Sequence, residues 1–155
     1  MKLRVLAVGK LKAGYSRDAA ADYLARVNRY VPCDVVEVRD AMRAGDEARE
    51  RAVEGDRLRE LAAGRDAFRV ALDMEGESYS SEGFARFLGE RMTHGRRELA
   101  FLIGGPHGLA PALRADADLR LSLSTLTFPH DLARVVLLEQ LYRALTILRG
   151  EPYHK

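Results

Sequence analysis

The chain has 155 residues, of which 47% are hydrophobic and 31% are charged, a balance typical of a soluble globular protein. This length predicts a single domain over residues 1–155. No apolar stretch reaches the ~20 residues that a membrane span needs, and the apolar start is too short for a signal peptide. The single cysteine, Cys33, excludes an internal disulfide, and we expect it to be a small buried hydrophobe in a cytoplasmic protein.

The net charge of +2 is too small to indicate a nucleic-acid partner. Its distribution is uneven, because residues 1–30 carry seven Lys and Arg against two Asp. The last thirteen residues carry Arg143, Arg149 and Lys155 against Glu151 alone. Positive charge at both ends permits contact with RNA, although charge alone favours an ordinary solvated surface.

The first half of the chain alternates between strand-like and helix-like segments. Residues 2–8 (KLRVLAV) and 34–38 (DVVEV) have the pattern of strands. Residues 16–30 have helical spacing, with Ser16 as the expected cap, and residues 43–63 predict a long charged helix. The apolar stripe of this second helix runs through Ala48, Val53, Leu58 and Leu61.

The second half continues the alternation. We predict strands over 68–72, 98–103 and 119–123, helices over 80–94, 111–117 and 130–148, and a tail over 150–155. Ser80 or Ser81 is the expected cap of the first of these helices. Strands that alternate with helices predict an α/β fold, with a mainly parallel sheet and helices on both faces.

Residues 101–110, FLIGGPHGLA, hold three glycines and a proline at the end of a predicted strand. Such a cluster indicates either a tight turn or a close approach of the backbone to something else. The first strand is followed by AVGKLKAG, which is not a dinucleotide fingerprint, and no Walker A motif is present. A second unusual segment, SLSTLTFPH at 122–130, follows the last strand. Because ligands bind at the carboxyl ends of parallel strands, we predict a ligand site in the last third of the chain.

The helix at 130–148 is apolar nearly all round, so we expect it to be buried nearly all round. One face would cover the sheet and the other would meet a second subunit. The predicted subunit contacts are Leu137, Leu141 and Leu145. Asp131 is the expected cap of this helix, and Glu139 and Arg143, four residues apart, are expected to form an ion pair in the interface.

Three segments, LIGGPHG, SLSTLTFPHDLARVVLLEQLYRA and the closing PYHK, together resemble the RlmH family. This family consists of ribosomal large-subunit methyltransferases of the SPOUT (α/β-knot) superfamily. The resemblance covers the whole chain, from KLRVLAVGK through ALDMEGE to the end. It implies a homodimer with a carboxyl-terminal trefoil knot that binds S-adenosylmethionine. It also implies methylation of N3 of a pseudouridine in a 23S rRNA stem-loop, at the subunit interface of the assembled ribosome.

The resemblance also implies site residues. The cofactor pocket would be lined by Leu72, Gly104, Gly105, Ser124, Thr125, Leu126, Thr127, Phe128 and Pro129. Gly104 and Gly105 would let the chain lie against both the adenosine and the threaded segment of the knot, where a Cβ would occupy the volume of the ligand. A tight turn without a ligand is the alternative. In the tail, Tyr153 would stack on a base and His154 or Lys155 would meet phosphate, unless the tail is a frayed end. Candidates for a catalytic, positioning or RNA-binding role are His130, Arg134, Arg143, Tyr153 and His154.

We expect no metal, because a sulfonium methyl group is already activated and the four histidines lack the spacing of a ligand set. We also expect no membrane partner, because no apolar stretch is long enough to span a bilayer. Two other functions stay open. One is a SPOUT methyltransferase that acts on another RNA, such as tRNA. The other is a non-catalytic RNA-binding SPOUT dimer. The sequence contains no separate RNA-binding domain, which favours a substrate as large as the ribosome.

Overall fold

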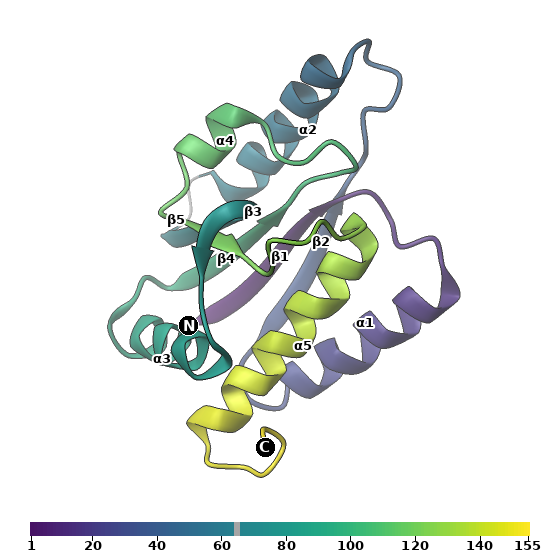
Figure 1. Cartoon of the computed structure of the whole chain (residues 1–155). Coiled ribbons are helices and arrows are strands. Elements are labelled where there is room, and N and C mark those ends of the chain that lie inside the picture. Colours follow the sequence, from purple (N-terminus) through teal and green to yellow (C-terminus); the bar gives the residue numbers. More distant parts are fainter. Residues whose placement is uncertain (64–65) are drawn as a thin grey trace.

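The computed structural model describes residues 1–63 and 66–155. The strands are β1 (Lys2–Val8), β2 (Cys33–Val38), β3 (Ala67–Ser78), β4 (Glu98–Ile103) and β5 (Leu119–Ser122). The helices are α1 (Gly14–Val27), α2 (Glu47–Ala62), α3 (Ser81–His94), α4 (Pro111–Ala115) and α5 (His130–Leu148). The strands form one parallel sheet in the order β2-β1-β4-β3-β5 (Figure 1).

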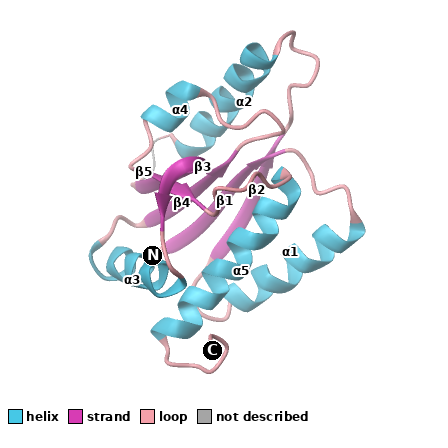
Figure 2. Cartoon of the chain, in the orientation of Figure 1, coloured by secondary structure: helices cyan, strands magenta, loops and turns pink. Residues whose placement is uncertain are grey.

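Helices cover both faces of the sheet, as predicted (Figure 2). Along β1, Val5 points to the core beneath α1, α3 and α5, while Leu6 points to the core beneath α2 and α4. Both side chains are fully buried, as expected for a parallel strand with helices on either side. The α/β fold class is therefore confirmed. The trefoil knot stays a prediction.

The start of α1 differs from the prediction. The helix begins at Gly14 with Ala13 as its N-cap, and no side chain caps it. Ser16 lies inside the first turn and is buried, so its prediction as a cap was wrong. Cys33 was predicted correctly: it is 7% exposed, and burial raises the pKa of its thiol to about 12.

The buried face of α2 also differs from the predicted stripe. Ala48 is exposed, whereas the buried face includes Glu50 and Glu54 beside Leu58. The helix begins after Asp46, whose side chain accepts a hydrogen bond from a backbone N–H of the first turn. The predicted stripe was right at Leu58 and wrong at Ala48. It missed the two buried carboxylates, because pattern reading places every carboxylate on the solvent side.

Strand β3 continues six residues beyond the predicted end at Leu72, to Ser78. The pairing with β5 shifts register between Leu72 and Glu77. A Cβ at Gly76 would lie 2.5 Å from the carbonyl oxygen of Arg120. Glycine is required there because the extension of β3 passes directly over the backbone of β5.

Helix α5 has the predicted bounds, but its neighbours differ from the prediction. Leu137, Leu141 and Leu145 are at most 2% exposed within one chain, because α5 lies between α1 and α3 on the sheet (Figure 1). Their prediction as subunit contacts was therefore wrong. The N-cap is Pro129 and no side chain caps the helix, so the prediction that Asp131 caps α5 was also wrong. Asp131 instead pairs with His130 at 2.9 Å.

Candidate functional site

A pocket of about 410 Å³ opens beside the carboxyl ends of β4 and β5 and the middle of β3. Its apolar lining includes Leu72, Ile103, Leu109, Leu121 and Leu123. The volume lies within the ~300–1,000 Å³ range of small-molecule sites. This is the edge of the sheet where α/β proteins bind ligands, and where the sequence predicted a site.

Most of the predicted cofactor residues meet in this pocket. Its lining includes Leu72, Gly104, Ser124, Leu126, Thr127 and Phe128. Gly105, Thr125 and Pro129 are not among the lining residues. The loop from Ser124 is shaped by its own hydroxyl, since Ser124 Oγ accepts a hydrogen bond from Leu126 N at 3.0 Å. The hydroxyl of Ser122 in turn donates to the carbonyl of Ser124 at 3.1 Å.

The glycine pair lies where other parts of the protein approach the backbone closely. A Cβ at Gly104 would lie 2.4 Å from the carbonyl carbon of Gly108 and 2.7 Å from the backbone nitrogen of Leu109. A Cβ at Gly105 would lie 3.2 Å from the Glu54 carboxylate and 3.2 Å from a Val8 methyl group. In both places the atoms that exclude a side chain belong to the protein. These distances show a close approach of the backbone at Gly104, and the contact of the glycines with a ligand stays a prediction.

Buried acids of α2 support this glycine segment. Glu54 is 5% exposed and accepts a hydrogen bond from Ala41 N at 3.1 Å. Burial raises the pKa of the Glu54 carboxyl, and this effect outweighs the hydrogen bond from Ala41 N, which lowers the pKa. Glu50, also buried, lies with its Oε2 3.3 Å from Nε2 of His107, and His107 lines the pocket. The sequence analysis assigned no role to these three residues.

A third acid with a buried side chain lines the pocket itself. Asp73 belongs to the unpredicted extension of β3, and its side chain is 5% exposed. Its Oδ2 is 3.5 Å from Arg114 and 3.4 Å from Arg120. Arg114 and Asp73 both line the pocket. The alternation of apolar and charged residues after Leu72, in LDMEGE, was the available signal for a longer strand.

The start of α5 contributes two of the predicted residues in different ways. His130 lines the pocket. Arg134 is 2% exposed and outside the lining, where Nη1 pairs with Glu37 at 2.6 Å and Nη2 donates to the Gly9 carbonyl at 2.9 Å. Arg134 therefore fastens α5 to the ends of β1 and β2.

Arg143, Tyr153 and His154 meet at the other end of α5. Oε1 of Glu139 accepts hydrogen bonds from Arg143 Nη2 at 2.6 Å and from the Tyr153 hydroxyl at 3.1 Å. The predicted ion pair four residues apart is therefore confirmed. The Arg143 guanidinium lies 4.8 Å from the centre of the Tyr153 ring, and burial raises the pKa of the Tyr153 hydroxyl. These contacts pack the tail against α5, so it is not a frayed end.

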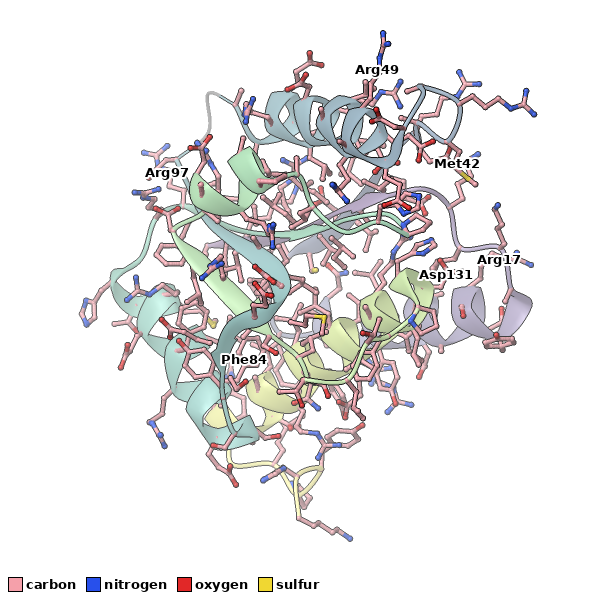
Figure 3. All side chains as sticks on the ribbon, turned by 45° about the horizontal axis from the view of Figure 1, so that its top comes forward. Arg17, Met42, Arg49, Phe84, Arg97 and Asp131 are labelled. Carbon is pink, nitrogen blue, oxygen red and sulfur yellow. The ribbon has the colours of Figure 1, made fainter. Side chains whose placement is uncertain are left out.

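The predicted site residues thus form two groups on one chain. His130 and Arg143 are thirteen positions apart on one helix, which at 1.5 Å per residue separates them by about 20 Å. Figure 3 shows Asp131 at one end of α5 and the carboxyl-terminal tail at the other. No group of three or more potential metal ligands occurs in the described ranges 1–63 and 66–155. None of the helices in that part of the chain could cross a membrane.

A pocket of this volume at the carboxyl edge of a parallel sheet defines an α/β protein that binds a small ligand. The family model described as "Predicted SPOUT methyltransferase" matches residues 1–154. The chain belongs to the SPOUT methyltransferase family.

Curated relatives match nearly the whole length of the chain. It is 46% identical to the ribosomal RNA large subunit methyltransferase H of Geotalea daltonii, over 99% of both chains. It is 45% identical to the protein of that name from Syntrophotalea carbinolica, again over 99% of both. The fold resembles a methylase family protein of Haemophilus influenzae (TM-score 0.59, 11% identity, 99% of this chain and 70% of that one). It also resembles a methyltransferase of Legionella pneumophila solved with bound SAM (TM-score 0.50, 10% identity, 91% and 65%).

Proposed function

We propose that this protein transfers a methyl group from S-adenosylmethionine to N3 of a pseudouridine in a 23S rRNA stem-loop of the assembled ribosome. Family membership over residues 1–154 supports methyl transfer. Full-length similarity to relatives named ribosomal RNA large subunit methyltransferase H supports the RNA substrate. The observation that carries the proposal is the pocket in which Gly104 meets the loop from Ser124 to Phe128. A ribosomal substrate would place the reaction in the cytoplasm.

The residues of the pocket fit the proposed cofactor. Leu72, Leu109 and Leu123 offer an apolar surface suited to an adenine ring, while Ser124 and Thr127 offer hydroxyls suited to hydrogen bonds. When bound, S-adenosylmethionine supplies a methyl group that its sulfonium sulfur already activates. The pocket residues would then orient the cofactor and exclude water, because alignment of the reacting atoms supplies much of the rate.

The residues at the other end of α5 suit RNA. Tyr153 offers an aromatic ring for a base, and His154 and Lys155 offer groups that bind phosphate. Arg143 would support them, held between Glu139 and His154. His130, beside the pocket, would contact the target nucleotide. Arg134 would act from outside the pocket, by holding the start of α5 in place.

We also propose that the active form is a homodimer. On one chain the tail and the pocket lie at opposite ends of α5, about 20 Å apart. A tail that is packed against its own α5 cannot reach its own pocket, whereas the tail of a second copy, with α5 running in the opposite direction, can. Leu126 and Leu132, at the pocket end, are 72% and 44% exposed, which supports a contact there with the second copy.

The test is labelled methyl transfer from S-adenosylmethionine to assembled ribosomes, isolated subunits, naked rRNA and tRNA, measured side by side. We expect label in 23S rRNA, with ribosomes as the best substrate. Label in tRNA alone would favour a SPOUT enzyme with another RNA substrate. Cofactor and RNA binding without any transfer would favour a non-catalytic RNA-binding dimer.

A further inference from the structure

The imidazole of His154 lies between two groups of opposite hydrogen-bonding character. Its Nδ1 is 3.2 Å from Nη1 of Arg143, and its Nε2 is 2.9 Å from Oε1 of Glu82. Arg143 comes from α5, four residues from Glu139, whereas Glu82 comes from the first turn of α3. The tail is therefore attached to two helices through one ring.

The two partners determine which nitrogen of His154 carries the proton. A guanidinium can only donate hydrogen bonds, so Nδ1 of His154 has to accept from Arg143. An ionised carboxylate can only accept, so Nε2 has to donate to Glu82. Glu82 is ionised at neutral pH, because the hydrogen bond to His154 holds the pKa of its carboxyl below the ordinary value. Only the neutral Nε2–H tautomer satisfies both contacts.

Arg143 cannot easily move aside to accommodate another arrangement. Its Nε and Nη2 both donate to Oε1 of Glu139, at 3.0 and 2.6 Å, and its plane lies over the ring of Tyr153. Glu82 is 57% exposed and has more freedom. The orientation of the His154 ring therefore depends on the carboxylate that Glu82 places opposite this fixed guanidinium.

We propose that Glu82 is a positioning residue for the carboxyl-terminal tail, which holds His154 in the neutral Nε2–H tautomer with its ring against Arg143. This inference rests on the proposed function for its role in catalysis, because the tail is there proposed to contact RNA. The tautomer and the ring orientation themselves are properties of the protein without RNA. A tail that is already ordered would lose less conformational entropy when RNA binds.

The consequence for the reaction concerns proton transfer. With Nδ1 accepting from Arg143 and Nε2–H donating to Glu82, neither nitrogen of His154 is free to take a proton from the target base. In this arrangement His154 contributes its Nε2–H donor and the surface of its ring to the contact with RNA. To contact phosphate through Nε2–H, the ring would exchange the Glu82 carboxylate for a phosphate oxygen, without a change in protonation.

The experiment compares the full-length protein with Glu82→Gln and Glu82→Ala. Glutamine keeps an oxygen that accepts from Nε2–H but loses the charge, whereas alanine loses the acceptor. Glu90→Ala is the matched control, since Glu90 is also an exposed acid of α3 and, within the part of the chain that the structure describes, forms no hydrogen bond or ion pair with the tail. If the Glu82 carboxylate acts only by placing a negative charge at the N-terminus of α3, then Glu82→Gln and Glu82→Ala behave alike, because both remove that charge.

Nitrogen-15 NMR of the histidine rings is the first readout, with the His154 signals assigned by comparison with His154→Asn. We expect Nε2–H of His154 to be protected from solvent exchange in the native protein, in Glu82→Gln and in Glu90→Ala. In Glu82→Ala we expect exchange to be fast and the two tautomers to average. Fast exchange in the native protein, or equal spectra for Glu82→Gln and Glu82→Ala, would overturn the proposal.

Steady-state methyl transfer to ribosomes is the second readout. We expect Glu82→Ala to lower kcat/KM about two- to fivefold, the scale of an exposed ion pair, with Glu82→Gln in between and cofactor affinity unchanged. An equal fall in cofactor affinity would contradict a role confined to the tail. If the native protein methylates no ribosomes but keeps the protected Nε2–H, then the proposed function fails while the positioning by Glu82 stands.

Discussion

The ring of Tyr153 packs against the ring of Tyr142, with the two ring centroids 4.6 Å apart and the Tyr153 hydroxyl 3.1 Å from a Glu139 carboxylate oxygen. Tyr142 in turn lies near Tyr23 of α1, with centroids 6.4 Å apart. The last residues of the chain thus join α1 and α5, at the end of α5 farthest from the pocket.

Replacing Tyr153 by alanine is expected to lower methyl transfer to ribosomes by about one to two powers of ten, because a stacked base contributes about 1–3 kcal/mol. Tyr153→Phe keeps the ring and loses one hydrogen bond, so it should retain most of the activity. Cofactor affinity should be unchanged in both variants. Calorimetry and rate measurements on the same preparations check this, and full activity in Tyr153→Ala would exclude a role for the ring.

Gly104→Ala and Gly105→Ala should differ, although the glycines are adjacent. At Gly104 the new methyl group meets backbone, at 2.4 Å from the Gly108 carbonyl carbon, and only a shift of the chain can relieve the clash. At Gly105 it meets the Glu54 and Val8 side chains at 3.2 Å, which can adjust. Because overpacking costs about 1–3 kcal/mol, we expect Gly104→Ala to lower both melting temperature and cofactor affinity more than Gly105→Ala. The opposite order in calorimetry would contradict this geometry.

Glu54→Gln should raise the stability of the protein at neutral pH. Burial raises the folded-state pKa of this carboxyl above the unfolded value, so the folded state binds more protons than the unfolded state between the two values. Stability therefore falls as pH rises through this window, and the charged side chain is destabilising above it. Glutamine removes that charge and keeps an acceptor for Ala41 N.

Urea unfolding as a function of pH measures this effect. The advantage of Glu54→Gln should be present at neutral pH and disappear as pH falls below the ordinary carboxyl value of 4.5. Glu47→Gln, at a side chain 68% exposed on the same helix, serves as the control and should change little. A native protein that is more stable than Glu54→Gln at neutral pH would contradict the assigned direction.

Leu132→Glu should convert a dimer into a folded monomer. Leu132 is 44% exposed at the pocket end of α5, and burying a leucine contributes about 1.5–3 kcal/mol, once for each copy in a symmetric contact. Met92→Glu, at a 38% exposed residue of α3, should leave the dimer intact. Leu141→Glu should unfold the chain, because Leu141 is fully buried within it. Light scattering and circular dichroism distinguish these outcomes, and a monomeric native protein would contradict the proposed homodimer.

The sequence predicted the elements best where a glycine or proline ends an apolar run. Strand β4 ends at Ile103, directly before Gly104, and helix α5 begins after Pro129, and both elements have the predicted bounds. The pattern also indicated correctly that α5 is buried on several sides. It could not indicate what covers α5, because neighbouring helices of the same chain and a second subunit bury the same residues.

The candidate site was harder to predict from the sequence than the helices and strands. Six of the nine predicted cofactor residues line the pocket, but they were taken from a family resemblance. Asp73 and the buried Glu50 and Glu54 were missed, since charged residues are ordinarily assigned to the surface. Their burial depends on partners that the fold brings together from distant segments, as Arg114 and Arg120 do for Asp73.

The central claim is methylation of a pseudouridine at N3, and identification of the product nucleoside tests it most directly. Ribosomes that lack the modification would be incubated with the protein and S-adenosylmethionine, and the 23S rRNA digested for chromatography and mass spectrometry. We predict a single new product, N3-methylpseudouridine, in a stem-loop at the subunit interface, absent from the reaction without cofactor. A methyl group on a ribose, on another base, or only on tRNA would contradict the proposed substrate.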